Sequence, residues 1–525
     1  MSGEPPTTAP PAKADSLKVG SWVSTTYFAE GFPYSVVNSL AEILFKELGA
    51  SLQVIGLTSL FHLPWNLKFL WGPFVDGYET KRRWLLGCEV ALVVLIALIA
   101  LLSAGAEAAL GLLALGFLIL GLLSATHDIA IDGYYLEALD PIEQSRWVGF
   151  RAASYRLAML AVGGPLLWLC AKIGWTGGLG LAALAMALLL GYHTLLLPDI
   201  ERRKRSWVAL LAPLASVRGL AIVGVIAGIW ALENYLALGT AASFEIREFV
   251  DARPAMAWLS DKLAGGAWAA VLLLLALLVG LALLPLLRRR LRARRDAGGL
   301  SDYAANFVSF LDQPRVGVIL AFIILFRTGE SFLQKMRWPF LDDVLHLPLE
   351  QFGMINGTIG VVASFLATIL GGRLIARDGL RKWIWPFVLA QNLLNLLYVG
   401  LALLPWDWFP RDPELASAMP IGIETLTVSA VIVAEHIGAG FGTAVFMVYI
   451  MRACDPAHKA GHMAIVTALM SVSFTIAGVG SGFIAAEIGY ASYFGFTFVA
   501  TVPAMLLILF VPYLDGRSSD QAPRT

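Results

Sequence analysis

The residues of this sequence best placed for chemistry are charged side chains inside long apolar runs. Asp128 and Asp132 are four residues apart, so an α-helix would bring both carboxyl groups to one face. The next apolar run carries Arg151 and the deeper Arg156, and an antiparallel neighbouring helix could pair these arginines with the two acids. Placing a charge at the centre of a bilayer costs at least about 2.5–3.5 kcal/mol, so we expect each of these residues to have a structural or a functional role. For Asp132 with Arg151 a structural ion pair and a functional pair are both open; for Asp128 and Arg156 we favour a function.

Three further residues could complete this set of charges. Lys68 and Tyr155 lie in neighbouring apolar runs, and Glu30 lies in the middle of another, beside Gly31 and Pro33. A Gly–Pro break frees backbone groups, which transporters tolerate where a helix lines a cavity. Desolvation favours the protonated form of an isolated carboxyl, so Glu30 could load and release a proton, or simply bond a neighbouring helix. We therefore predict that proton-coupling groups in this half are Glu30, Asp128 and Asp132.

A second set of charges lies in the C-terminal part of the chain. Arg327 and Glu330 are three apart and can pair on one helix face. The same run continues with Gln334, Lys335 and Arg337, a polar stripe along one helix. The cations of both sets would bind an anionic solute. The predicted solute-binding residues are Lys68, Tyr155, Arg156, Arg327, Lys335, Arg337 and Gln391; Gln391 could instead join helices.

Glu435 and His436 lie at mid-depth of a later apolar run. Neighbours on a helix point about 100° apart, so we expect that they cannot both face one partner. One should line a cavity while the other contacts a packed helix. Histidine titrates near physiological pH, so His436 could take part in coupling or could be a packing residue. We predict Glu330, Glu435 and His436 as the proton-coupling groups of this half.

Membrane-spanning helices must position these residues. Hydrophobic residues make up 58% of the 525-residue chain and charged residues only 14%, against about 45–50% and 25% in soluble proteins. Runs of about 20 apolar residues, long enough to cross about 30 Å of hydrocarbon, recur along the chain. The predicted fold is an all-α polytopic membrane protein with about fourteen helices, divided six, two and six. The predicted spans are 20–47, 51–77, 82–104, 108–138, 143–172, 175–197, 214–244, 264–288, 314–345, 349–376, 382–404, 421–453, 459–486 and 492–514.

The loops indicate how the chain is oriented and divided. Lys and Arg concentrate in alternate short loops, which marks the cytoplasmic side and places both termini there. The basic cluster at 288–295 is an orientation signal that could also bind anionic lipid. We predict a disordered cytoplasmic tail at 1–19, a six-helix bundle at 20–200, a basic linker with a two-helix insert at 201–298, a second six-helix bundle at 299–515 and a tail at 516–525.

Composition and motifs exclude several classes of protein. Lys+Arg and Asp+Glu are balanced at 38 each, which argues against a nucleic-acid partner. Three scattered cysteines offer neither a disulfide framework nor a zinc site. The sequence contains no Walker A motif, no HExxH and no GxSxG. We therefore expect no cofactor and a secondary transporter rather than a membrane enzyme, although a transporter-like sensor would have the same sequence features.

A weak internal repeat relates the two halves. Gly72 and Asp76 precede a basic loop in the first half, and Gly372 and Ala376 hold the corresponding positions before a basic loop in the second. Glycine there would let a helix end pack closely on a neighbour, and we predict Gly72, Asp76 and Gly372 as gating residues. The pattern resembles the cytoplasmic loop motif of the major facilitator superfamily, although Ala376 replaces the usual Asp.

Three stretches resemble a narrower family within that superfamily. Segments of the peptide–acetyl-coenzyme A transporter family are similar to residues 67–76 (LKFLWGPFVD), 128–134 (DIAIDGY) and 28–33 (FAEGFP). The resemblance implies two six-helix halves that rock about a midplane site, and proton-driven transport of an anionic solute. The family holds bacterial muropeptide permeases of the AmpG type and eukaryotic acetyl-coenzyme A carriers; we favour a muropeptide, with acetyl-coenzyme A or another anionic metabolite or peptide as the alternative. Expected partners are this small anionic solute, protons and membrane lipids, with the protein a monomer in a bacterial inner membrane.

Overall fold

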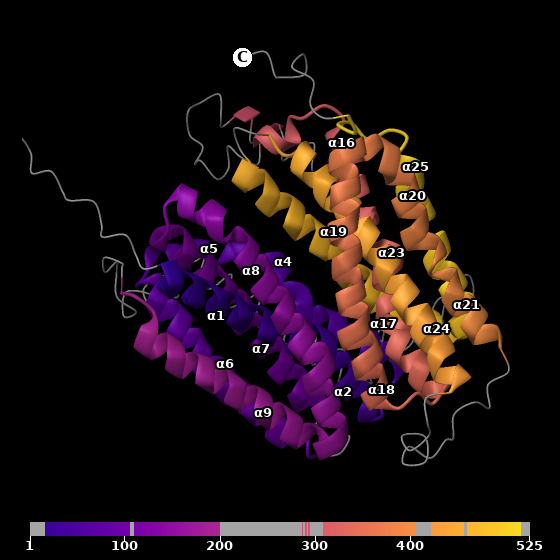
Figure 1. Ribbon diagram of the computed structural model, residues 1–525, viewed down its shortest axis with the longest axis horizontal. Coiled ribbons are helices and arrows are strands. Elements are labelled where there is room, and N and C mark those ends of the chain that lie inside the picture. Colours follow the sequence, from indigo (N-terminus) through magenta and orange to yellow (C-terminus); the bar gives the residue numbers. More distant parts are fainter. Residues whose placement is uncertain are drawn as a thin grey trace, which may run out of the picture.

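A computed structural model of the chain describes residues 16–105, 110–199, 308–404, 422–455 and 459–515, with a few isolated residues between 286 and 293. The described residues are almost entirely helical and form two bundles, one from each half of the chain (Figure 1). Within the part of the chain that the structure describes, eight helices, some of them two spans joined through a kink, are long and apolar enough to cross a membrane. Apart from Leu286, the predicted insert helices 214–244 and 264–288 lie outside the described residues, so the count of fourteen stays a prediction.

The N-terminal half follows the predicted order of spans. The first span ends at Glu47, the second at Gly77, and Gly174 (φ 80°) separates the fifth from the sixth. A positive φ favours glycine, which explains the kink. The elements are α1 (Ser16–Ser35), η1 (Val36–Leu40), α2 (Ala41–Glu47), α3 (Leu52–Leu57), η2 (Thr58–His62), α4 (Leu63–Leu67), η3 (Lys68–Leu70), α5 (Gly72–Gly77), α6 (Lys81–Leu102), α7 (Leu110–Ala138), α8 (Pro141–Ala161), η5 (Val162–Leu166) and α9 (Leu167–Leu196).

The C-terminal half repeats this arrangement. Gly489 (φ 73°) kinks α24 and separates its last two spans, as Gly174 does in the first half. The elements are α16 (Val316–Leu325), α17 (Thr328–Asp343), α18 (Leu349–Phe352), η6 (Gly353–Gly360), α19 (Val361–Asp378), α20 (Leu380–Leu393), α21 (Leu396–Leu403), α23 (Ile423–Ala453), α24 (Lys459–Val499) and α25 (Val502–Leu507).

The first span differs from the sequence prediction in two ways. Helix α1 begins at Ser16, inside the segment predicted to be a disordered tail. The break expected at Gly31 and Pro33 is also wrong, because α1 continues through Pro33 to Ser35. Proline removes one helical hydrogen bond, and here the π-helical segment η1 follows directly after that turn. Gly31 serves close packing instead: a Cβ there would lie 2.8 Å from the carbonyl oxygen of Tyr155 on α8.

Small residues let the two halves approach each other along two seams. In one seam, α24 packs on α3, and Cβ atoms at Gly478 and Gly482 would overlap Ser59 and the carbonyl of Leu52. In the other seam, η5 packs on η6 around Gly163, Gly164 and Gly357. Small residues at helix interfaces permit close backbone approach inside a membrane. The glycine pattern 478/482 therefore joins the two halves.

Gly482→Ala should destabilise the contact between the halves. The new methyl group would meet backbone of α3, which cannot move aside as a flexible side chain would, so we expect a cost of about 1–3 kcal/mol. Thermal unfolding of the purified protein in detergent measures this loss. Gly495→Ala, in the same helix but with no described atom within 4 Å of its Cβ, is the matched control. Equal melting temperatures for the two variants would contradict the prediction.

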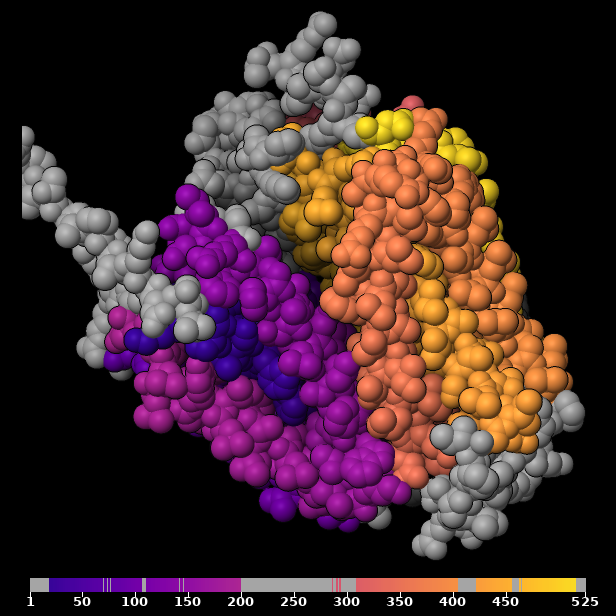
Figure 2. Space-filling view, in the orientation of Figure 1, coloured from indigo at the N-terminus to yellow at the C-terminus, as the bar shows by residue number. Residues whose placement is uncertain are grey.

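Polar contacts between the halves concentrate toward one end of the molecule. We call the end with residues 78–80, 379 and 454–455 the basic-loop end, and the end with residues 48–51 and 344–348 the opposite end. At the opposite end Lys46 pairs with Asp343 at 2.5 Å and with Asp342 at 2.9 Å, and Lys172 pairs with Glu350. Nearer the middle, Asn66 of α4 bonds Thr475 and Ser471 of α24 across the halves. At the basic-loop end, Arg82 bonds the carbonyl of Leu197, and Arg381 bonds Asp515, each within its own half. The bundles meet around α2, α9 and α18 in Figure 1 and lie side by side in the space-filling view of Figure 2.

Candidate functional site

Three carboxyl groups meet inside the N-terminal bundle. Glu30 comes from α1, and Asp128 and Asp132 come from one face of α7, as their spacing predicts. Carboxylate oxygens of the three residues all lie within 4.8 Å of one another. Glu30 and Asp128 are buried, and Asp132 is half-buried. We call these three residues the acidic cluster.

Two cations and a phenol contact the acidic cluster. Lys68 Nζ lies 2.5 Å from Asp128 Oδ2, and Arg151 Nη2 lies 2.8 Å from Asp132 Oδ1. The Tyr27 hydroxyl donates to Asp132 Oδ1 at 2.8 Å, and the Arg151 guanidinium lies 4.5 Å from the centre of the Tyr27 ring. The expected partner of Asp132 is therefore present, whereas Asp128 pairs with Lys68 and not with Arg156.

The charges of this cluster do not balance. Three carboxyl groups face two cations, so the fully ionised set carries one uncompensated negative charge. Oε2 of Glu30 is buried and has no hydrogen-bond partner. One proton on the cluster would neutralise it; a small monovalent cation held by the three carboxyl groups would do the same. Burial makes the neutral arrangement strongly preferable to the charged one.

A second network surrounds Glu330 in the C-terminal bundle. Arg327 forms two hydrogen bonds to it, from Nη2 to Oε1 at 2.8 Å and from Nε to Oε2 at 3.1 Å. Gln334 donates to Oε1 at 2.9 Å and Gln391 to Oε2 at 3.4 Å. Gln391 is 3% exposed and packs against Gly442, so among the described residues it supports Glu330 and does not line the cavity described below. Glu330 is thus a fully engaged carboxylate.

Arg337 lies at the centre of a third network. Its Nη1 is 3.3 Å from Glu435 Oε2 and 3.0 Å from His436 Nε2, and it also bonds Asn356. The expectation that Glu435 and His436 cannot share a partner is therefore wrong. Their side chains leave α23 in different directions, but the long arginine side chain from α17 reaches between them. His436 lines the central cavity, while Glu435 is buried at 2% exposure.

Arg337→Met should strongly destabilise the protein. The change leaves Glu435 buried and without its cation, and losing one partner of a buried pair costs about 3–5 kcal/mol. Unfolding in mixed micelles, followed by tryptophan fluorescence, measures the loss. Arg337→Met combined with Glu435→Leu removes the orphaned charge and should recover most of the stability. A single variant as stable as the wild-type protein would show that Glu435 needs no cation.

A central cavity of about 200 Å³ lies between the halves. Uncharged hydrogen-bonding groups line it, including Asn38, Ser39, Gln334 and Asn356. Its charged groups are already paired: Lys335 Nζ contacts Glu42 Oε2 at 2.8 Å and the hydroxyl of Thr58 at 2.7 Å. Lys335 therefore bridges from α17 to the N-terminal half. The cavity offers hydrogen bonds to a solute but no free cation among its described residues.

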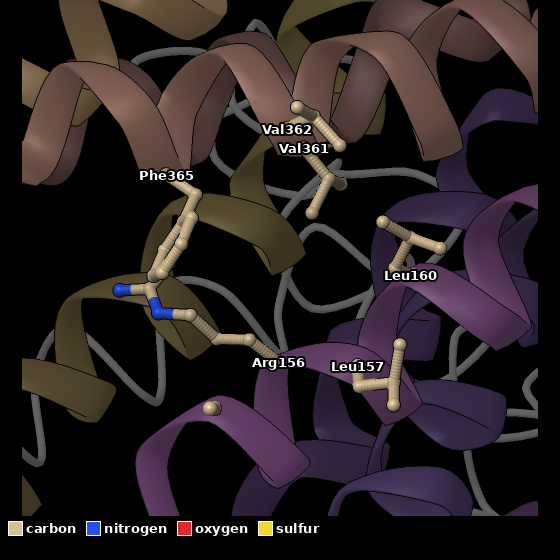
Figure 3. Close-up of a pocket in the computed structure, with 7 residues that line it drawn as sticks. Arg156, Leu157, Leu160, Val361, Val362 and Phe365 are labelled. Atoms are coloured by element: carbon tan, nitrogen blue, oxygen red, sulfur yellow. The ribbon is translucent and has the colours of Figure 1, made fainter. Parts of the chain in front are cut away.

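Arg156 lies in a smaller pocket of about 180 Å³ beside this cavity (Figure 3). The pocket lies between α8 and α19. The guanidinium carbon of Arg156 lies 5.5 Å from the centre of the Phe365 ring. Among the described residues no carboxylate pairs with Arg156. Neighbouring Tyr155 contacts the ring of Tyr34, 5.7 Å between ring centres. The predicted solute-binding cations thus fall into two groups, with Arg156 unpaired and the others engaged.

The loop-motif residues do not pack as expected. At Gly72 and Gly372 a Cβ would meet no described atom within 4 Å, so close helix packing is not the reason for glycine there. Both positions lie near the basic-loop end. The side chain of Asp76 lies outside the described residues. The gating role of these three residues stays a prediction.

Several residues of these networks were not identified from the sequence, among them Tyr27, Glu42 and Asn356. Tyr27 lies in the first span, and its hydroxyl contacts the acidic cluster. Glu42 also lies in that span, and it is the partner of Lys335. Tyr27 and Glu42 both lie in the predicted span 20–47, which is mostly apolar. Glu42 could have been singled out on the same ground as Glu30, since each is an acidic residue within a predicted span. The partners of Tyr27 and Glu42 are more than 100 positions away, so no local spacing could identify the contacts.

The chain resembles known proteins over almost its whole length. A Haemophilus influenzae protein of undescribed function is 24% identical over 94% of both chains. The anhydromuropeptide permease of Escherichia coli K12 is 24% identical over 92% of this chain and 77% of the permease. The transporter AmpG 4 of Rickettsia conorii is 20% identical over 92% of this chain and 93% of the relative. No family model matches the chain.

Solved structures share its fold. A peptide transporter of the POT family with bound sulfate superposes with a TM-score of 0.62 at 14% identity, covering 95% of both chains. The xylose transporter XylE of Escherichia coli gives 0.54 at 12% identity, covering 96% of this chain and 98% of XylE. The fold is that of the major facilitator transporters, and the chain is a multi-pass membrane protein. Its named relatives are permeases and transporters, not enzymes. In sequence the chain is similar to the anhydromuropeptide permease and to a transporter named AmpG. The narrower peptide–acetyl-coenzyme A label stays a prediction.

Proposed function

We propose that this protein is a proton-coupled permease for an anionic cell-wall fragment of the muropeptide type. The observation that carries the coupling is the unbalanced acidic cluster, three carboxyl groups against Lys68 and Arg151. One proton completes that balance, so protonation and deprotonation switch the charge of a buried site. Relatives named as AmpG transporters and as an anhydromuropeptide permease support the class of solute.

The side chains that line the central cavity and the neighbouring pocket of Arg156 suit a solute with an uncharged polar part and an acidic part. The central cavity presents amides, a serine and an imidazole, groups that hydrogen-bond hydroxyls and amides. The unpaired Arg156 nearby suits a carboxylate. A muropeptide combines sugar and peptide acid. Acetyl-coenzyme A or another anionic metabolite or peptide is the alternative, since phosphate also suits an arginine.

The arrangement of the halves suggests the transport cycle. Ion pairs join them at the opposite end, so this conformation corresponds to access from the basic-loop end. We place that end and both termini in the cytoplasm of a bacterium, with the protein a monomer in the inner membrane, because basic loops face inward. Residues 20–200 and 299–515 would rock as rigid units about the central cavity. Protonation of the acidic cluster and binding of solute would shift the population between the two states.

Counterflow in proteoliposomes tests the proposal. Vesicles loaded with unlabelled anhydromuropeptide should take up labelled anhydromuropeptide, and an inward-directed proton gradient should drive accumulation without internal solute. Acetyl-coenzyme A and a neutral disaccharide serve as competing solutes. Exchange of acetyl-coenzyme A alone would assign the alternative solute class, and absence of exchange for every solute would overturn transport itself.

A further inference from the structure

The pocket around Arg156 has a composition unlike that of the central cavity. Apart from Arg156, its lining is apolar, and it includes Leu157 and Leu160 of α8 and Val362 and Phe365 of α19 (Figure 3). Val361 lines both this pocket and the central cavity, so the two spaces adjoin. One wall belongs to each half of the protein. The pocket therefore exists only while α8 and α19 lie side by side.

Arg156 differs from the other intramembrane cations of the site. Each of the others has a carboxylate within 3.3 Å: Lys68, Arg151, Arg327, Lys335 and Arg337. Among the described residues Arg156 has no carboxylate partner; its guanidinium carbon lies 5.5 Å from the centre of the Phe365 ring, and Arg327 is near enough to repel it electrostatically. A guanidinium without an anion is costly in a membrane. An anionic group bound beside Arg156 would neutralise this positive charge.

We propose that this pocket binds the carboxylate of the transported solute together with a small alkyl group attached next to that carboxylate. This inference rests on the proposed function and adds where the acid binds and what must stand beside it. The guanidinium would hold the carboxylate through paired hydrogen bonds, a geometry that suits arginine better than lysine. The alkyl group would contact Leu157, Leu160 and Val362. An occupant would touch both halves and stabilise the arrangement seen here.

The depth of Arg156 argues against a lipid headgroup as the occupant. Arg156 stands fifteen positions after Pro141, the first residue of α8. At a rise of 1.5 Å per residue it lies about 22 Å along the helix from that end. The kink at Gly174, where the same span ends, lies eighteen positions, or about 27 Å, on the other side. Arg156 is therefore near the middle of a span that crosses about 30 Å of hydrocarbon, far from the phosphates of either leaflet.

Ligand-detected NMR on the full-length protein in zwitterionic lipid nanodiscs tests the proposal with simple probes. The probes are N-acetylalanine, its uncharged amide, and N-acetylglycine, which lacks the methyl group. We expect the acid to bind at least tenfold more tightly than the amide, and the alanine methyl group to receive the strongest saturation. Arg156→Gln should remove the preference for the acid, and Arg156→Lys should restore part of it. Val362→Thr should reduce only the preference for alanine over glycine.

Arg146→Gln is the matched control, since this arginine lies in the same helix but at its exposed end, against Trp147. Equal binding of acid and amide by the wild-type protein, or an unchanged preference in Arg156→Gln, would overturn the inference. So would displacement of the probe by phosphatidylglycerol, which would indicate a lipid site. These probes do not depend on transport. Failure of anhydromuropeptide counterflow with normal probe binding would therefore overturn the proposed function and leave the pocket assignment standing.

Discussion

Proteoliposomes containing Glu30→Gln protein should exchange solute but fail to accumulate it in response to a pH gradient. In the wild-type cluster three carboxyl groups face Lys68 and Arg151, so charge balance requires one proton. In the variant, Asp128 and Asp132 alone balance the two cations in every step of the cycle. The halves can then rock without a proton. We expect counterflow within about threefold of the wild-type rate, and accumulation at least tenfold lower, a change of about 1.4 kcal/mol in driving force.

Two comparisons make this result decisive. Glu143→Gln, in the first turn of α8 and outside the acidic cluster, should leave both measurements unchanged. A sodium gradient replacing the proton gradient should drive no uptake by the wild-type protein; sodium-driven uptake would mean that a metal cation fills the cluster. Accumulation by Glu30→Gln equal to that of the wild-type protein would remove Glu30 from the coupling mechanism.

Helix periodicity predicted the relations within single spans. The spacing of Asp128 and Asp132 placed both on one face of α7, and the spacing of Arg327 and Glu330 let them pair across the first turn of α17, which Arg327 precedes. The spans that the structure describes were predicted to within a few residues, because apolar run length reflects membrane thickness. Two of the predicted boundaries, 172–175 and 486–492, fall at the kinks at Gly174 and Gly489. These features depend only on residues near one another in the chain.

The choice of partners could not be predicted in the same way. Asp128 pairs with Lys68 instead of Arg156, because α4 and η3 pass closer to it than the deeper turn of α8 does. Lys335 was predicted to bind solute, yet it holds Glu42 across the interface of the halves. Such pairs depend on how helices distant in sequence are packed and rotated. Among the predicted solute-binding cations, Arg156 alone has no described carboxylate partner. This difference became visible only when the partners of the other four cations were known.

Lys335→Met should weaken the closure of the opposite end of the transporter. Lys335 is 4% exposed and bridges α17 to Glu42 and Thr58 of the N-terminal half. Loss of a buried charge partner costs about 3–5 kcal/mol, and the half-buried Glu42 recovers part of this through water. We therefore expect the closed population at this end to fall about tenfold relative to the open one, which corresponds to about 1.4 kcal/mol.

Distances between spin labels at Ser51→Cys and Ala486→Cys, both exposed and one in each half, report this equilibrium. The three native cysteines are buried and should not be labelled. Lys46→Met is the matched control, because its ion pairs also cross between the halves but with acids 35% and 38% exposed, and surface pairs contribute only about 0–1 kcal/mol. The exchanged pair Lys335→Glu with Glu42→Lys should restore the short distance. An unchanged distance distribution in Lys335→Met would contradict the prediction, because the glycine seams would then be sufficient to hold the halves together.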